Sequence, residues 1–161
     1  MIQIKDGNIL EQDLFLCGHV TNCMGVFGSG MALQIKQQYP KAFEDYIEFA
    51  HKTPAPQRMG QVNFSAQQNG GAMYIANMHA QFNYGHGQRH LNYEAFYKCL
   101  EQVRDFCKKN ENVADVAKYG IGFPYKIGSD RAGGDWEIVA KMIERVFFEC
   151  EYPVIFWRLK G

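Results

Sequence analysis

The sequence predicts an α/β fold: a central mixed sheet covered by helices on both faces, which makes three layers. Short apolar runs of strand length alternate along the chain with longer segments in which apolar residues recur every three or four positions. Two glycine-rich turns each follow a predicted strand and lead into a predicted helix, as is typical of such sheets. The chain has 161 residues, 47% of them apolar, so we expect one domain over residues 1–161.

The N-terminal third of the chain carries signals for two strands and two helices. Residues 1–5 alternate weakly, whereas residues 13–20 (DLFLCGHV) form a nearly continuous apolar run, as expected for a strand buried on both faces. Apolar residues then recur at helical spacing over residues 30–39, and Pro40 should end that helix. The same spacing predicts a second helix over residues 42–50.

The middle of the chain predicts a hairpin, a loop and a helix. Residues 61–66 and 72–78 have strand character and flank the polar turn QQNGG, which favours an antiparallel pair. The segment HAQFNYGHGQRH, residues 79–90, follows as a long polar loop, and loops placed directly after strands often carry function. Residues 92–109 then place their apolar side chains on one helical face.

The C-terminal third predicts a strand, a helix and a final strand. A strand is expected near residues 118–124, and the pattern over residues 113–116 is ambiguous. The clearest helical periodicity in the chain covers residues 136–150, and residues 154–157 predict the last strand. Because strands and helices alternate, we expect a partly parallel sheet with some antiparallel pairing.

Charge and cysteine content exclude several classes of protein. Basic and acidic side chains balance at 17 each, so no overall positive field is available to hold nucleic acid. The five cysteines form no CxxC pair, which fits neither a disulfide framework nor a cysteine zinc site and favours core thiols in a reducing compartment. No charged leader precedes an apolar run, and no segment reaches about 18 apolar residues. We expect a cytoplasmic protein without membrane association.

The first glycine-rich turn, NCMGVFGSGMA, joins a predicted strand to a predicted helix. Gly25, Gly28 and Gly30 allow the backbone to approach a ligand, and the free N–H groups of a helix start suit an anion such as phosphate. The order G-x-x-G-x-G reverses the dinucleotide fingerprint, and no Lys-Ser/Thr pair follows as it does in a P-loop. The alternative is a plain strand-to-helix turn without a ligand.

A second glycine-rich segment, PYKIGSDRAGGDW at residues 124–136, has the same placement between a strand and a helix. Two such loops at neighbouring strand ends would hold the two halves of a diphosphate, mainly through backbone N–H groups. Together with the opening DGNIL and the middle stretch IANMHAQ, these loops make nearly the whole chain resemble the macrodomains, a family that binds ADP-ribose. It is most similar to the ADP-ribose-1''-phosphate phosphatase branch, which includes bacteriophage and fungal versions and shares the run from His19 to Ala32.

The resemblance implies a set of ADP-ribose-binding residues. Asn8 and Ile9 would lie beside the adenine, Asn22 would bind the distal ribose, and the two glycine loops would surround the diphosphate. The ligand-binding residues implied in this way are Asn8, Ile9, Asn22, Gly28, Ser29, Gly30, Met31, Gly128, Ser129, Asp130, Arg131, Ala132, Gly133 and Gly134.

Two places depart from the family pattern. Many macrodomains have an aspartate where this chain has Asn8, whose side-chain oxygen can still accept a hydrogen bond from the adenine amino group, without charge assistance. Relatives often read Gly-Cys-Gly-Leu-Ala-Gly-Gly in the second loop, where this chain has Asp130 and Arg131. Arg131 would add a cation, and Asp130 would repel a diphosphate unless it faces away or pairs with Arg131. Both residues would equally suit an exposed surface.

His19 matches a histidine implicated in catalysis in the phosphatase branch, and it stands three residues before Asn22. Such a histidine would orient or deprotonate a water that attacks phosphorus, or protonate the departing ribose oxygen. Asp135 is the carboxylate best placed in the sequence to act with it. The alternatives are a packed core histidine and an acidic residue in the first turn of a helix.

No cofactor and no metal are expected. His79, His86 and His90 lie within twelve residues, but they lack the spacing of a helical metal site and have no cysteine or acidic ligand among them. The resemblance places this loop above the adenosine and ribose, so His79 and Gln81 would line the pocket.

Three functions remain open at this level. The first is hydrolysis of ADP-ribose-1''-phosphate to ADP-ribose and phosphate, which His19 favours. The second is removal of ADP-ribose from a modified protein or nucleic acid, although the segment YIANMHAQ lacks the lysine that one branch of macrodomains uses. The third is ADP-ribose binding without turnover. The expected partner is the small molecule or a modified macromolecule, and we expect a monomer. The reversed glycine order disfavours an NAD-dependent oxidoreductase.

Overall fold

A six-stranded sheet forms the centre of the protein. The structure is a computed structural model, and it describes residues 2–25, 27, 30–68, 70–82, 90–110, 114–129 and 132–159. Its strand order is β1-β6-β5-β2-β4-β3, and only β3 pairs antiparallel to its neighbour. The strands are β1 (Ile2–Asp6), β2 (Leu14–Asn22), β3 (Val62–Ala66), β4 (Ala72–Gln81), β5 (Ile121–Pro124) and β6 (Val154–Arg158). The predicted mixed sheet and the predicted β3–β4 hairpin are therefore confirmed.

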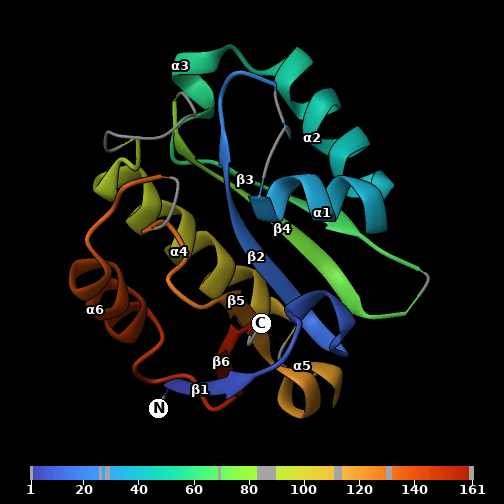
Figure 1. Ribbon diagram of the computed structural model, residues 1–161, viewed down its shortest axis with the longest axis vertical. Coiled ribbons are helices and arrows are strands. Elements are labelled where there is room, and N and C mark those ends of the chain that lie inside the picture. Colours follow the sequence, from blue (N-terminus) through green and yellow to red (C-terminus); the bar gives the residue numbers. More distant parts are fainter. Residues whose placement is uncertain are drawn as a thin grey trace.

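Helices cover both faces of the sheet (Figure 1), which confirms the three-layer α/β/α architecture. The helices are α1 (Gly30–Gln38), α2 (Pro40–Lys52), α3 (Ala55–Arg58), α4 (Tyr93–Lys109), α5 (Ala114–Tyr119) and α6 (Trp136–Val146), and residues Ile9–Glu11 form a 3-10 turn, η1. Helices α1 and α2 pack on one face, and α4 and α6 pack on the other (Figure 1). No helix in the described part of the chain has the length and apolar character needed to span a bilayer.

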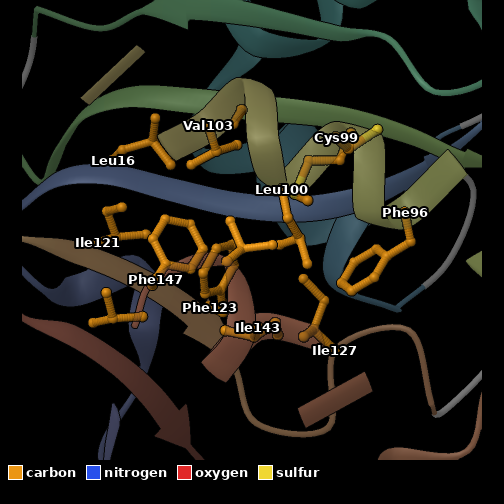
Figure 2. Packing of buried hydrophobic residues seen from close by; sticks show 14 of the residues in the cluster. Leu16, Phe96, Cys99, Leu100, Val103, Ile121, Phe123, Ile127, Ile143 and Phe147 are labelled. Atoms are coloured by element: carbon orange, nitrogen blue, oxygen red, sulfur yellow. The ribbon is translucent and has the colours of Figure 1, made fainter. Parts of the chain in front are cut away.

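Alternation along β4 assigns its side chains to the two faces. Ala76, Met78 and Ala80 join the core that α4 and α6 cover. Figure 2 shows how Leu100 of α4, Phe123 of β5 and Ile143 of α6 meet in this core. Burial of each such large apolar side chain contributes about 2 kcal/mol. The intervening β4 residues face the α1–α2 layer, where two of them are polar, and this layer holds the first part of the candidate site.

Two predicted boundaries near the C-terminus are wrong. The strand expected near residues 118–124 begins only at Ile121, because α5 occupies Ala114–Tyr119 and Gly120 turns the chain with φ +65°. A side chain on Gly120 would collide with the carbonyl oxygen of Pro153. The last helix ends at Val146 instead of continuing to residue 150; the apolar spacing persists past its end because Phe147 is still buried.

The five parallel strands end at one edge of the sheet, and the segments predicted to bind a ligand follow these ends. Asp6 of β1 pairs with Arg158, and Asn22 of β2 pairs with Gln81 of β4. In the β2–β5 pairing, Leu16 lies opposite Ile121 and Cys17 opposite Gly122; continuing this register puts His19 level with Pro124, where β5 ends. His19 therefore lies beside the start of the second glycine loop, although it is inside a strand.

Candidate functional site

His19 lies in the layer between the sheet and α2, where a second strand fixes its ring. Its Nε2 is 2.6 Å from the side-chain oxygen of Asn77, the neighbouring residue on β4. The amide nitrogen of Asn77 donates to the carbonyl oxygen of Ala42 on α2 at 3.1 Å, which sets the orientation of the amide. Nε2 of His19 must then carry the proton, and Nδ1 is a lone-pair acceptor. Nδ1 is buried and has no hydrogen-bond partner among the described residues.

Burial lowers the pKa of His19 to about 4, although the Asn77 hydrogen bond acts in the opposite direction. The side chain is 2% exposed, and the ring of Phe27 meets it edge-on at 5.3 Å between centroids. At neutral pH His19 is therefore an uncharged imidazole. It can accept a proton or a hydrogen bond through Nδ1, but it holds no proton to give from that atom.

The turn after β2 is fixed by two side chains that the sequence did not single out. The hydroxyl of Tyr46 on α2 contacts both the carbonyl oxygen of Asn22 (2.8 Å) and its side-chain Oδ1 (3.1 Å), and it accepts from the N–H of Gly25 (2.9 Å). Arg58 at the end of α3 donates to the carbonyl oxygen of Cys23 at 2.6 Å. Tyr46 lies within the helix predicted over residues 42–50, and Arg58 lies in α3, a short helix that the sequence did not predict.

Arg58 brings a buried positive charge to this turn. Its side chain is 8% exposed, and its guanidinium also donates to the carbonyl oxygens of Ala50 (2.7 Å) and Thr53 (3.0 Å) at the end of α2. These carbonyl groups form the negative end of the helix dipole, which favours a cation there. Arg58 thus joins the end of α2 to the turn that begins the first glycine loop.

His79 is buried beside the same turn. Its Nε2 is 2.9 Å from Oδ1 of Asn63, its Nδ1 is 3.3 Å from the hydroxyl of Thr21, and its ring stacks on that of Tyr46. Burial, and after it the nearby charge of Arg58, lowers the pKa of His79 to about 3. The sequence expected His79 to line the pocket, and the structure places it in the packed layer under α2.

In the described residues, no group of three or more histidine, cysteine, aspartate or glutamate side chains lies close enough to hold a metal. His86 falls outside the described residues, and Nε2 of His90 is buried with no hydrogen-bond partner among those residues. Four of the five cysteines are buried free thiols, as predicted.

The second glycine loop is held in place from within and from the side. The N–H of Gly134 donates to the carbonyl oxygen of Gly128 at 2.8 Å, and a side chain on Gly134 would collide with that oxygen and with Leu91. The carbonyl oxygen of Ala132 accepts from the N–H groups of His90 and Leu91, at 2.7 and 2.9 Å. Gly128 and Gly133 have φ near +74° and +73°, which glycine tolerates best. The described parts of this loop, on either side of residues 130–131, are therefore tied to each other and to residues 90–91.

Several predicted loop positions are placed only in part. Gly28, Ser29, Asp130 and Arg131 lie outside the described residues. Gly30 and Met31 form the first residues of α1 and are partly exposed. Ser129 in the second loop has a buried hydroxyl without a partner among the described residues.

Asn8 and Ile9 follow β1 at the same edge of the sheet. Asn8 caps the 3-10 turn η1: its Oδ1 accepts from the N–H of Leu10 at 3.0 Å. One lone pair of this oxygen is therefore already used, and the second is what an adenine amino group would meet. Ile9 is 6% exposed and packs with the α1–α2 layer.

Asp135 is the N-cap of α6. Its Oδ1 accepts from the N–H of Glu137 at 2.9 Å, and its own N–H donates to the hydroxyl of Tyr93 on α4. Helices α4 and α6 cover the face opposite the one that His19 faces. Among the described residues no hydrogen bond joins Asp135 to His19, and Asp135 has the role of a helix cap.

Substitution of Asp135 separates capping from charge. Asp135→Ala is expected to lower the free energy of unfolding by about 1 kcal/mol, because the N–H of Glu137 loses its acceptor. Asp135→Asn keeps an equally good cap and is expected to stay within about 0.5 kcal/mol of the wild type. Urea unfolding of the three proteins measures both effects. An equal loss of stability in the two variants would contradict the capping role.

The sequence of this chain is similar to those of known proteins. A family model described as "Macro domain" matches residues 19–143. Over 92% of this chain and 94% of the relative, the sequence is 25% identical to an ADP-ribose 1''-phosphate phosphatase of Saccharomyces cerevisiae. A stretch of 46 residues, 29% of this chain and 13% of the relative, is 41% identical to a DNA ADP-ribosyl glycohydrolase of Mycobacterium tuberculosis.

Solved structures show the same fold. The macrodomain of Mycobacterium tuberculosis DarG matches with a TM-score of 0.76 and 22% identity, covering 100% of this chain and 99% of that chain. Thermosipho africanus DarTG in complex with ADP-ribose matches with a TM-score of 0.76 and 16% identity, covering 97% of this chain and 41% of that chain.

Proposed function

This chain belongs to the macro domain family, and on that premise we propose that it binds ADP-ribose and hydrolyses ADP-ribose-1''-phosphate to ADP-ribose and inorganic phosphate. The observation that carries the proposal is His19, a neutral imidazole whose Nδ1 has no partner among the described residues, on the strand that ends in Asn22. The full-length similarity to an ADP-ribose 1''-phosphate phosphatase supports the choice of substrate.

In this proposal the strand ends share the work of binding. Asn8 and Ile9 would receive the adenine, the two glycine loops would hold the diphosphate through backbone N–H groups, and Asn22 would bind the distal ribose. The arrangement is supported by the common edge at which these segments leave the sheet. The hydrogen bonds that hold Gly128, Ala132 and Gly134 in place would reduce the entropy that binding costs at these residues.

The proposed reaction is attack of water on phosphorus. A new bond forms between the water oxygen and phosphorus, the bond between phosphorus and the ribose oxygen breaks, and that oxygen takes up a proton from solvent. Nδ1 of His19 would accept the proton of the attacking water. The low pKa of His19 supports this role rather than protonation of the departing oxygen, since the ring is uncharged at neutral pH. Asp135 stays in the proposal only because it is the carboxylate that the sequence favours as a partner of His19; its hydrogen bonds are those of a helix cap.

A second candidate is ADP-ribosyl hydrolysis on a modified macromolecule. It is favoured by the 46-residue match to a DNA ADP-ribosyl glycohydrolase. The strand region YIANMHAQ offers no lysine for the lysine-based version of this reaction, so a substrate-assisted water attack would be needed. Binding of ADP-ribose without turnover is the third possibility.

One substrate panel separates these functions. The protein is incubated in parallel with ADP-ribose-1''-phosphate, an ADP-ribosylated DNA oligonucleotide and an ADP-ribosylated protein, while released phosphate and released ADP-ribose are measured. We expect phosphate from the first substrate and little ADP-ribose from the others. Release of ADP-ribose from the oligonucleotide or the protein, with no phosphate from the first substrate, would favour the second candidate. Tight ADP-ribose binding by calorimetry with no turnover would leave a binding module.

A further inference from the structure

A groove of about 1210 Å³ lies at the edge of the sheet opposite the candidate site. It is lined by the C-terminal parts of α4 and α6, by α5, and by the segment between α6 and β6, which we call the Phe148 turn (residues 147–152). Helix α5 leads into β5 and the Phe148 turn leads into β6, so the groove lies where these parallel strands begin. The candidate site lies where the parallel strands end, and the groove is therefore separate from it.

The Phe148 turn presents an apolar ring to solvent. Phe148 is 81% exposed, whereas the preceding Phe147 is 4% exposed and its N–H donates to the carbonyl oxygen of Ile143 at 3.0 Å. The N–H of Cys150 donates to the carbonyl oxygen of Phe147 at 3.2 Å, and the Cys150 thiol donates to the hydroxyl of Tyr152 at 3.0 Å. Because these contacts already hold the turn, burying the Phe148 ring against a partner would gain hydrophobic free energy at a small cost in backbone entropy.

The groove also contains charged side chains that form no ion pair among the described residues. Three of these side chains are basic and three are acidic: Lys108, Lys141, Arg145, Glu144, Glu149 and Glu151. Arg104 and Asp105 line the groove as well, and they pair with each other at 3.2 Å. Equal numbers of positive and negative groups are thus available to a partner.

The two signs of charge are separated within the groove. The helices contribute four basic and two acidic side chains, which leaves an excess of two positive charges on the helical wall. The Phe148 turn contributes Glu149 and Glu151 and contains no basic residue. One part of the groove is therefore complementary in charge to another part, as a surface must be if it is to pair with a copy of itself about a two-fold axis.

We propose that this groove is the interface of a homodimer with two-fold symmetry. The Phe148 turn of each copy enters the groove of the other copy, where Phe148 covers the apolar side chains of Val116 and Val146. Glu149 and Glu151 then face the basic helical wall of the other copy. The chain carries no net charge, so no overall repulsion opposes this pairing. The proposal differs from the monomer expected from the sequence, and it does not rest on the proposed function.

Sedimentation velocity of the full chain at concentrations from about 1 to about 200 μM tests the proposal. We expect the wild type to shift from monomer to dimer as the concentration rises. Phe148→Ser is expected to raise the dimer dissociation constant about tenfold or more, because buried aromatic anchors carry much of the binding energy of an interface. Leu159→Ser is the matched control: it removes another exposed apolar side chain, at the opposite edge of the sheet, and is expected to leave the dissociation constant unchanged.

Charge reversal tests the two-fold arrangement. A turn variant carries Glu149→Lys and Glu151→Lys, and a wall variant carries Lys108→Glu and Arg145→Glu. Either variant alone brings like charges together in both halves of the dimer, and we expect its dissociation constant to rise about tenfold or more. An equimolar mixture of the two variants is expected to form a heterodimer, because each turn then meets a wall of opposite charge.

Three results would overturn the proposal. The first is a wild-type chain that stays monomeric at about 200 μM, which would leave the groove to a different partner. The second is a dimer that Phe148→Ser and Leu159→Ser weaken equally, and the third is a mixture of the turn and wall variants that stays monomeric. Calorimetry with ADP-ribose keeps these outcomes apart from the proposed function, since we expect wild type and Phe148→Ser to bind ADP-ribose equally.

Discussion

His19→Gln is expected to slow phosphate release from ADP-ribose-1''-phosphate by about a hundredfold or more, the usual range for loss of a general base. ADP-ribose affinity is expected to change by no more than a few-fold, because the proposed binding contacts come from other residues. Glutamine is chosen because its amide N–H can still donate to Oδ1 of Asn77, whereas alanine would leave that oxygen buried without a partner. Initial rates at saturating substrate, with calorimetry on ADP-ribose, measure the two effects.

His51→Gln is the matched control for this experiment. It removes an exposed histidine from the last turn of α2, away from the buried network around His19. It is expected to retain the wild-type rate. Phosphate release by His19→Gln at the wild-type rate would show that His19 is a core residue, and the attacking water would then have to be activated by the substrate or by another group.

Lowering the pH from 7 to about 5 is expected to destabilise the protein through its two buried histidines. The pKa of each lies well below the ordinary value of 6.5 in the folded chain, at about 4 for His19 and about 3 for His79. Below about pH 6.5 the unfolded chain binds a proton at each site that the folded chain does not, so stability falls as pH falls. The loss continues until the pH passes the folded-state pKa values.

The expected slope is large because the two effects add. Each histidine contributes about 1.4 kcal/mol per pH unit once its unfolded form is mostly protonated, and together they give close to 3 kcal/mol per pH unit below about pH 6. Urea unfolding at a series of pH values between about 7 and 5 measures the slope, in a range above the titration of most carboxylates. His19→Gln and His79→Gln are each expected to reduce it by about half. A free energy of unfolding that is the same at both ends of this range would contradict the prediction.

Much of the fold follows from local sequence patterns. The apolar run over residues 13–20 and the hairpin over residues 61–78 were placed correctly because strand periodicity and turn chemistry depend on neighbouring residues. The apolar spacing predicted a wrong helix end where the core buries a residue that lies outside the helix. Phe147 continues the apolar series of α6 although the helix has ended, because the core buries it in a turn. Helix α5 is too short for its period to be distinguished from that of a strand.

For the candidate site, too, local sequence patterns predicted one part and tertiary packing decided the other. The sequence by itself determined which segments leave the sheet at the ligand edge, since glycine turns between a strand and a helix are set by backbone freedom over a few residues. Only the tertiary structure decided how the buried polar groups pair, because the partners are far apart in the chain: His19 with Asn77, Tyr46 with Asn22, and Arg58 with Cys23. Burial and hydrogen bonding decide which ring nitrogen of His19 carries its proton, and neither exists before the layers pack.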